Sequence, residues 1–261
     1  MTTNEKIAIC ITAGEQSENH VGMQKNGTGL AEKGFSPDEL QLCKETLAKR
    51  NIVSEYYSLN AFLGDEKDSI EEAGLLIIRN GVQTISNNPD YADEMLKEQL
   101  SFEWDKHYWD TRRKRVLNKV ARYNLCYNSM GQEPDYENKK GRIISLENAP
   151  YLKKWRDTLS VIFGKSAENL ELEGNQYYDV KKCGIGFHGD GERKKVMACS
   201  LGASRPIHWQ WYQNTEQIGT RAEFILNHGD MYIMSEKTTG YDWKKRSIKT
   251  LRHAAGVKYV K

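Results

Sequence analysis

The last third of this chain is dominated by short runs of β-branched and aromatic residues with turns between them. Four runs follow one another: Val196 to Leu201, Ile207 to Tyr212, Arg221 to Leu226, and Met231 to Met234. Many short strands of this kind, after a helical layer, fit a jelly roll. We therefore expect an α+β protein in which residues 171–261 form a double-stranded β-helix. That shape presents ligands from different strands at one mouth.

The segment His188-Gly189-Asp190 stands near the beginning of this region. An imidazole and a carboxylate two residues apart on an extended backbone project from the same face. With one distant histidine they would make the two-histidine, one-carboxylate face that binds Fe(II) and leaves the opposite side open for substrates. The spacing alone does not decide this, because HGDG also suits a surface turn.

Further motifs surround this segment in a fixed order. Asn175-Gln-Tyr177 precedes it, and Ser200-Leu-Gly202, Gly229-Asp230 with an apolar run, and Arg252-His253 follow it. This order resembles the AlkB-like branch of the 2-oxoglutarate and Fe(II) dependent dioxygenases, and IGFHGDGE is close to the iron-binding segment of the DNA-repair members. The resemblance is confined to the last third of the chain. In the remainder, ENHVGMQ and QEPDYENKKG indicate a narrower subfamily of viral or phage origin.

The resemblance implies that His188, Asp190 and His253 are the metal ligands and the catalytic residues. His228 is the other candidate for the third ligand. In this branch the strand that begins with Gly-Asp precedes the distal histidine, so the motif order favours His253.

The resemblance also implies that 2-oxoglutarate chelates the iron and needs a cation for its far carboxylate, because an unpaired buried carboxylate is unfavourable. The family usually supplies an arginine after the distal histidine. Here the residues after it contain Lys258, which is the expected cation, and Arg252 is a second candidate. Asn175 and Tyr177 are expected to hydrogen-bond the cosubstrate. Because this arginine is missing, the alternative is that a different co-reductant binds at the iron. Ascorbate is the candidate for a reductant or co-substrate.

Substrate contacts are expected from residues close to the metal motif. Glu192 matches a position that approaches the target base in the repair enzymes, and Arg193 and Arg205 are expected at the same mouth. A plain surface role is the alternative for each. His20 lies in a long polar loop and either serves the substrate pocket or faces solvent.

The first 170 residues divide into two expected regions. Residues 1–88 are predicted to be a small α/β region, with strands over 6–12, 52–59 and 73–79. A helix is expected to begin at Ser36-Pro37 and to run to about Arg50, because Ser is a good N-cap and Pro suits the first helical position. Residues 89–170 are predicted to be helical and partly basic, ahead of the core at 171–261.

A long helix is predicted from Tyr91 to about Tyr123, and a second, amphipathic one from Pro150 to Phe163. The first would carry six lysines or arginines and no acid over residues 112–122. Such density suits phosphates, and the neighbouring aromatic residues suit stacked bases. We expect Arg112, Arg113 and Arg115 to bind nucleic acid, DNA or RNA. A solvated charged face, or pairing with acids of the same chain, is the alternative.

Composition excludes few functions. The chain has 261 residues and a net charge of +2, so any nucleic-acid site must rest on local clustering. Its five cysteines include no CxxC pair, which fits a reducing compartment. No signal peptide or membrane span is apparent, and a cytoplasmic or host-intracellular location is expected.

The expected function is oxidation of a nucleic-acid base by demethylation or hydroxylation. The alternatives are the same chemistry on a protein side chain or small metabolite, or an inactive jelly-roll binding module.

Overall fold

Two antiparallel sheets face each other in the computed structural model, which describes residues 6–260 apart from the side chains of residues 65–69. The larger sheet has the order β4 (Ser54–Ser58), β5 (Gly74–Ile78), β15 (Met231–Met234), β12 (Val196–Gly202), β1 (Ala8–Gly14), β10 (Glu171–Tyr177), β8 (Tyr123–Asn128) and β9 (Ile143–Ser145). Only its β8–β9 pair is parallel. The smaller sheet has the order β11 (Gly184–His188), β16 (Thr250–Gly256), β13 (Arg205–Gln213) and β14 (Glu216–Leu226).

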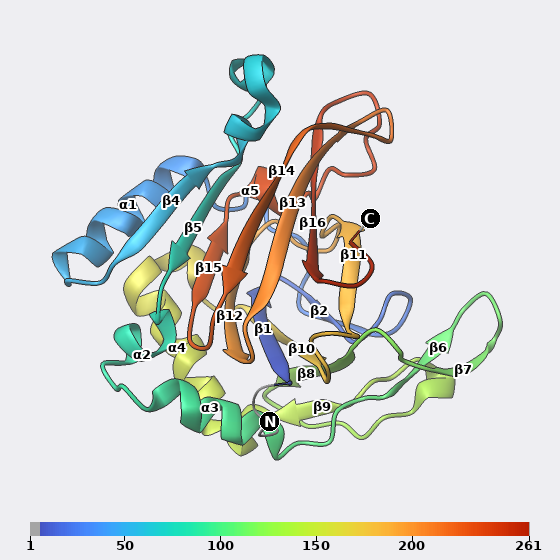
Figure 1. Ribbon diagram of the computed structural model, residues 1–261. Coiled ribbons are helices and arrows are strands. Elements are labelled where there is room, and N and C mark those ends of the chain that lie inside the picture. Colours follow the sequence, from blue (N-terminus) through green and yellow to red (C-terminus); the bar gives the residue numbers. More distant parts are fainter. Residues whose placement is uncertain (1–5, 261) are drawn as a thin grey trace.

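Helices cover the outer face of the larger sheet, and the smaller sheet covers its inner face (Figure 1). The helices are α1 (Pro37–Lys49), α2 (Gly81–Ser86), α3 (Tyr91–Leu100) and α4 (Pro150–Phe163), and the short α5 (Glu236–Thr239) follows β15. The side chains of β1 alternate accordingly. Ile9 and Ile11 pack in the core under the helices, whereas Ala8 and Cys10 lie between the sheets.

Several local predictions are confirmed. The helix at Ser36 begins with a capping box, in which the Ser36 hydroxyl accepts from the Glu39 N–H and the Glu39 carboxylate accepts from the Ser36 N–H. The helix from Pro150 to Phe163 has the predicted bounds, and its apolar side is buried. The coarse class, mixed α and β with several antiparallel sheets, is also confirmed.

The predicted long helix from Tyr91 to Tyr123 is wrong. Helix α3 ends at Leu100, and the indole N–H of Trp104 donates to the carbonyl of Gln99 at 3.0 Å, which folds the chain back on the helix end. The basic segment then forms a hairpin of β6 (His107–Asp110) and β7 (Arg115–Asn118). The hairpin projects from the body of the protein (Figure 1). The aromatic residues that suggested a helical face belong instead to strands and turns.

The three regions expected from the sequence share one sheet. Strands β1, β4 and β5 come from residues 1–88, β8 and β9 from 89–170, and β10, β12 and β15 from 171–261. Strand β1 lies between β12 and β10 and pairs with both. The long polar loop after β1 contains a small ladder of β2 (Ser17–Glu18) and β3 (Lys25–Asn26). The N-terminal segment therefore contributes directly to the layer that faces the smaller sheet.

Candidate metal centre

Two neighbouring strands bring the candidate ligands together. His188 ends β11, and the β11–β16 pairing sets it opposite His253. Asp190 follows two residues later, and its N–H donates to the carbonyl of Thr239 at 3.0 Å. One ligand atom from each of the three residues lies within 4.8 Å of the other two. His228 is not in this group, and its Nε2 lies 3.4 Å from Asp93.

The spacing of these atoms suits a shared ion. Nε2 of His188 and Nε2 of His253 lie 3.7 Å and 3.6 Å from Oδ1 of Asp190, which is longer than an ordinary hydrogen bond. The two imidazole rings are 4.3 Å apart between centres and tilted by 56°. Two imidazole nitrogens and one carboxylate oxygen on one side of a space form a donor set that fits a divalent transition metal with open positions.

The surrounding backbone sets the orientation of the ligands. Nδ1–H of His188 donates to the Gly186 carbonyl at 2.8 Å, which leaves Nε2 free to bind a metal. Burial, together with the neighbouring His188 and Arg193, lowers the pKa of His253 well below its usual value, so that its ring is neutral. A Cβ on Gly189 would clash with the carbonyl oxygen of Gly240, so this close approach requires glycine.

The triad lines a cavity of about 590 Å³ that also contains Arg205 of β13. Arg205 is only 2% exposed, and its guanidinium lies 4.7 Å from the ring centre of Tyr177. Its Nε and Nη1 have no hydrogen-bond partner among the residues that the structure describes. A buried guanidinium with free donors is unfavourable unless an anion binds it. Arg205 could therefore bind a carboxylate or another anion in the cavity.

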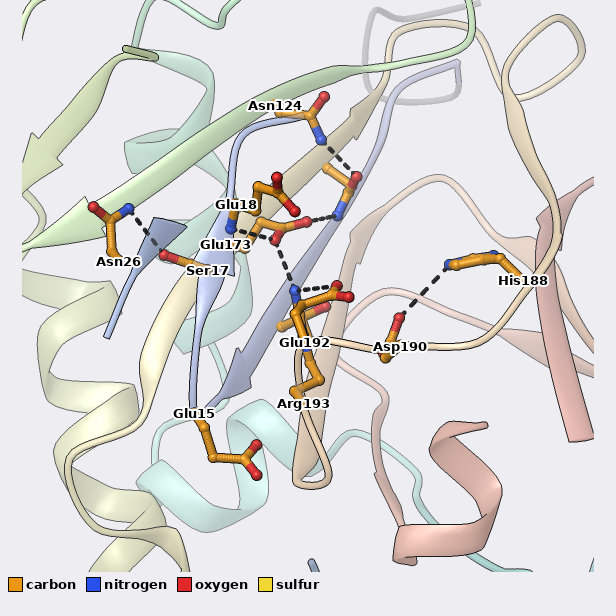
Figure 2. Close-up of polar contacts among 12 residues, drawn as sticks. Glu15, Ser17, Glu18, Asn26, Asn124, Glu173, His188, Asp190, Glu192 and Arg193 are labelled. Atoms are coloured by element: carbon orange, nitrogen blue, oxygen red, sulfur yellow. Dashed lines mark hydrogen bonds and ion pairs between the residues drawn. The ribbon is translucent and has the colours of Figure 1, made fainter. Parts of the chain in front are cut away.

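Acids and bases form a network along another part of the cavity (Figure 2). Glu173 of β10 accepts from Nη2 of Arg193 at 2.8 Å and from the N–H of Glu18 at 3.1 Å. Burial alone would raise the pKa of Glu173, but these two donors hold it below its usual value. Glu192 also contacts Arg193, at 3.3 Å, and burial raises the pKa of both Glu192 and Glu18. Arg193 thus bridges Glu173 and Glu192, and Glu173 in turn holds the backbone of Glu18.

Asn175 lies in the cavity wall and is held on both ends of its amide. Its Oδ1 accepts from Nε of Arg122 at 2.6 Å and from Nδ2 of Asn124 at 2.8 Å, while its Nδ2 donates to Glu173 at 3.2 Å. The buried Lys119 supports this wall, because its Nζ donates to Asn124 at 2.9 Å and to two oxygens of Asn19. Lys119 and Arg122, the last two cations of the basic segment, therefore belong to the cavity and its support.

Other predicted residues lie outside the cavity. Lys258 is exposed, with its Nζ 5.4 Å from the ring centre of Tyr259. Arg252 points to the opposite side of β16 from His253, and its guanidinium lies 4.0 Å from the ring centre of Tyr212. Arg112, Arg113 and Arg115 are exposed at the β6–β7 hairpin, where Arg113 pairs with Asp110 at 3.0 Å. The structure does not bring these five residues to the triad.

In the N-terminal loop, the sequence indicated His20 as a candidate pocket residue but gave no sign of Glu18. Glu18 and His20 both line the cavity, and the His20 ring stacks on Tyr108 of the hairpin with 3.7 Å between ring centres. Burial lowers the pKa of His20 to about 4. The unusual length and polarity of this loop was the available signal, because such loops inside a compact domain are often functional. No spacing in the sequence indicates which of its residues face the cavity.

Among the described residues, no helix has both the length and the apolar character needed to cross a bilayer. No family model matches the chain. It is similar to a protein of Acanthamoeba polyphaga mimivirus named "Uncharacterized protein R156", with 42% identity over 261 residues that cover 99% of this chain and 100% of the viral protein. Similarity of that extent over both whole chains establishes common descent, and the chain belongs to the same family as the mimivirus protein.

Proposed function

We propose that this protein is an AlkB-like, Fe(II) and 2-oxoglutarate dependent dioxygenase that oxidises a nucleic-acid base. The observation that carries the proposal is one cavity that contains both a two-histidine, one-aspartate group and a buried arginine with free donors. The first suits Fe(II), and the second suits the far carboxylate of a 2-oxo diacid.

The arrangement of strands supports a jelly-roll core of the double-stranded β-helix type. The triad lies where β11 and β16 of the smaller sheet face the larger sheet, as the expected fold would place it. In the larger sheet, the place between β10 and β12 is filled by β1, from the N-terminal segment. No strand after His253 is needed there. The expected cation then comes from β13, not from the residues after His253.

Each residue of the cavity has a separate part in this proposal. His188, Asp190 and His253 would hold the metal, and bound Fe(II) with 2-oxoglutarate and O2 would supply the oxidation of a substrate C–H bond. Arg205, supported by the ring of Tyr177, would bind the far carboxylate. Asn175 is already bonded at both ends of its amide, so we assign it to holding the cavity wall. Glu192 and Arg193 would line the substrate side.

Charge distribution favours a nucleic acid over the other substrates. The basic hairpin adjoins the cavity loop, since His20 stacks on Tyr108 and a Cβ on Gly22 would lie 3.1 Å from the side chain of Thr111. Phosphates held by Arg112 and Arg115 would leave a base free to enter the cavity. A protein side chain or metabolite remains the alternative substrate. The inactive binding module loses its support, because Arg205 is available in place of the missing arginine.

Succinate formation tests the chemistry. Purified protein with Fe(II), 2-oxoglutarate and O2 should release succinate, faster with an oligonucleotide that carries an oxidisable or methylated base. The Asp190→Ala variant should release none. If wild-type protein that binds iron stoichiometrically never forms succinate with any oligonucleotide, peptide or metabolite mixture, the oxygenase proposal is wrong. The viral relative supports an intracellular setting for this reaction, in a host cell.

A further inference from the structure

One cysteine lies in the wall of the cavity, beside the buried arginine. Cys10 is in the middle of β1, where its side chain lies between the two sheets, and it lines the cavity together with Arg205. Its Sγ lies 3.7 Å from the Tyr232 hydroxyl and 3.9 Å from the Thr12 hydroxyl. The other four cysteines, all of which the structure describes, do not line this cavity. Cys10 is therefore the thiol that a small molecule in the cavity meets.

The guanidinium of Arg205 makes the surroundings of this thiol electropositive. Arg205 is 2% exposed, and its Nε and Nη1 have no hydrogen-bond partner among the described residues. Burial alone would lower the pKa of Arg205, but the Tyr177 hydroxyl and the Cys10 thiol beside it raise that pKa above the usual arginine value. A cation next to a thiol favours the thiolate, which is the nucleophilic form. The unpaired donors that suit a bound anion therefore also favour reaction at Cys10.

The surroundings of the other cysteines suppress such chemistry. Burial raises the pKa of Cys43 to about 11 and that of Cys126 to about 12. Burial also raises the pKa of Cys183, and it raises that of Cys199 well above its usual value. A thiol with a raised pKa carries little thiolate near neutral pH and reacts slowly. Cys43 on α1 is the sharpest comparison, because it is more exposed than Cys10 and has no such cation beside it.

We propose that Cys10 is a site of oxidation by hydrogen peroxide, and that Arg205 holds the resulting sulfinate. The thiolate sulfur attacks one peroxide oxygen, the O–O bond breaks, and a sulfenic acid forms. A second peroxide converts the sulfenic acid to the sulfinic acid. Each step transfers one oxygen atom to sulfur, oxidises the sulfur by two electrons and reduces the other peroxide oxygen to water. The sulfinic acid then loses its proton, and the free donors of Arg205 bind the anion.

The modification needs only Cys10, Arg205 and the peroxide. Its consequence rests on the proposed function, because the sulfinate would occupy the donors that we assign to the far carboxylate of 2-oxoglutarate. Oxidation would thus exclude the cosubstrate from the cavity. Thiol reductants do not reverse a sulfinic acid, so this exclusion should persist after dithiothreitol is added.

Alkylation by two reagents of different charge tests the reactive thiol on the full chain with no metal added. Iodoacetate carries a carboxylate that Arg205 can direct to Cys10, whereas iodoacetamide is neutral. The ratio of the iodoacetate rate to the iodoacetamide rate at Cys10 should fall by about tenfold in Arg205→Gln, as expected for the loss of one charge-assisted contact. The same ratio at Cys43 should not change. In the wild type, glutarate should slow the iodoacetate reaction at Cys10 alone, which needs no variant to fold.

Peroxide treatment of the same protein, followed by mass spectrometry of its peptides, tests the oxidation. Two oxygen atoms should appear at Cys10 before any appear at Cys43, and dithiothreitol should not remove them. After loading with Co(II), the treated wild type and the treated Cys43→Ser variant should have lost 2-oxoglutarate binding, whereas the treated Cys10→Ser variant should retain it.

The outcomes separate this inference from the oxygenase proposal. If Cys10 reacts no faster than Cys43 with iodoacetate and with peroxide, or if Arg205→Gln leaves the ratio of the two alkylation rates unchanged, the inference is overturned. Dioxidised Cys10 in a protein that never binds 2-oxoglutarate, treated or untreated, would support the modification site and count against the proposed cosubstrate.

Discussion

The metal centre and the basic hairpin differ in how their residues come together. At the candidate metal centre His188 ends β11, His253 lies opposite it on β16, and Asp190 follows β11 by two residues, so one short motif carries two of the three candidate ligands. The basic segment at residues 112–122 divides: its first four cations are exposed on the hairpin, whereas Lys119 and Arg122 turn inward to the cavity. The short motif therefore predicted residues that the fold does bring together, whereas the run of like charges divides between the surface and the cavity.

The largest expected effect is loss of the metal. Replacing Asp190 with Ala removes the single anionic ligand between the two imidazoles and should weaken Fe(II) or Co(II) binding by at least about a hundredfold, more than the loss of a supporting residue. The matched control is His228→Ala, which removes a histidine that lies outside the triad. Anaerobic calorimetric titration measures both. Retained stoichiometric binding in Asp190→Ala would remove the metal assignment.

The next largest effect concerns the cosubstrate. Arg205→Gln should weaken 2-oxoglutarate binding by about 10- to 100-fold, because a charge-assisted contact contributes about 1.5–3 kcal/mol. Lys258→Ala is the control and should change nothing, since Lys258 is exposed. Apparent affinity can be measured through succinate formation at varied 2-oxoglutarate. The opposite pattern, with Lys258 important and Arg205 silent, would return the role to the cation that the sequence favoured.

These two tests reflect what the sequence could predict. The grouping of His188, Asp190 and His253 was predictable, because strand alternation set His188 and Asp190 on one face and the motif order of the family that the sequence resembles favoured His253. Arg205 was predicted as a substrate residue, but its burial against Tyr177, with two donor nitrogens left unpaired, depends on how the two sheets face each other. The part of Glu18 in the cavity depends on a contact with Glu173, 155 residues away. Periodicity carries no information about contacts of that range.

The hairpin test has a smaller expected effect. Replacing Arg112, Arg113 and Arg115 with Gln should lower nucleic-acid affinity and reduce the dependence of log affinity on log salt by about 0.7–0.9 for each phosphate that is no longer neutralised. The melting temperature should hardly change, since these side chains are exposed. The control variant replaces Lys44, Lys49 and Arg50, in and just after α1, with Gln. It removes the same number of positive charges from another part of the surface. A lower melting temperature with an unchanged salt slope would mean that the arginines pair within the chain.

A separate prediction concerns the pH dependence of stability, which does not involve ligand binding. Burial lowers the pKa of Lys119 from 10.5 to about 7, so between these values the unfolded chain binds more protons than the folded chain. The free energy of unfolding should therefore rise with pH across this window in the wild type, more than in Lys119→Met. Urea unfolding at several pH values measures the difference. Parallel pH profiles for the two proteins would show that Lys119 stays charged in its contacts with Asn19 and Asn124.

One measurement tests the central claim, that the triad and Arg205 together hold iron and a 2-oxo diacid. Anaerobic protein is loaded with Fe(II) and titrated with 2-oxoglutarate, while the visible charge-transfer absorption of a chelated 2-oxo acid is recorded. We predict that the band appears in the wild type, is absent in Asp190→Ala, and requires about 10- to 100-fold more 2-oxoglutarate in Arg205→Gln. An iron-loaded wild-type protein that shows no band at saturating 2-oxoglutarate would contradict the account.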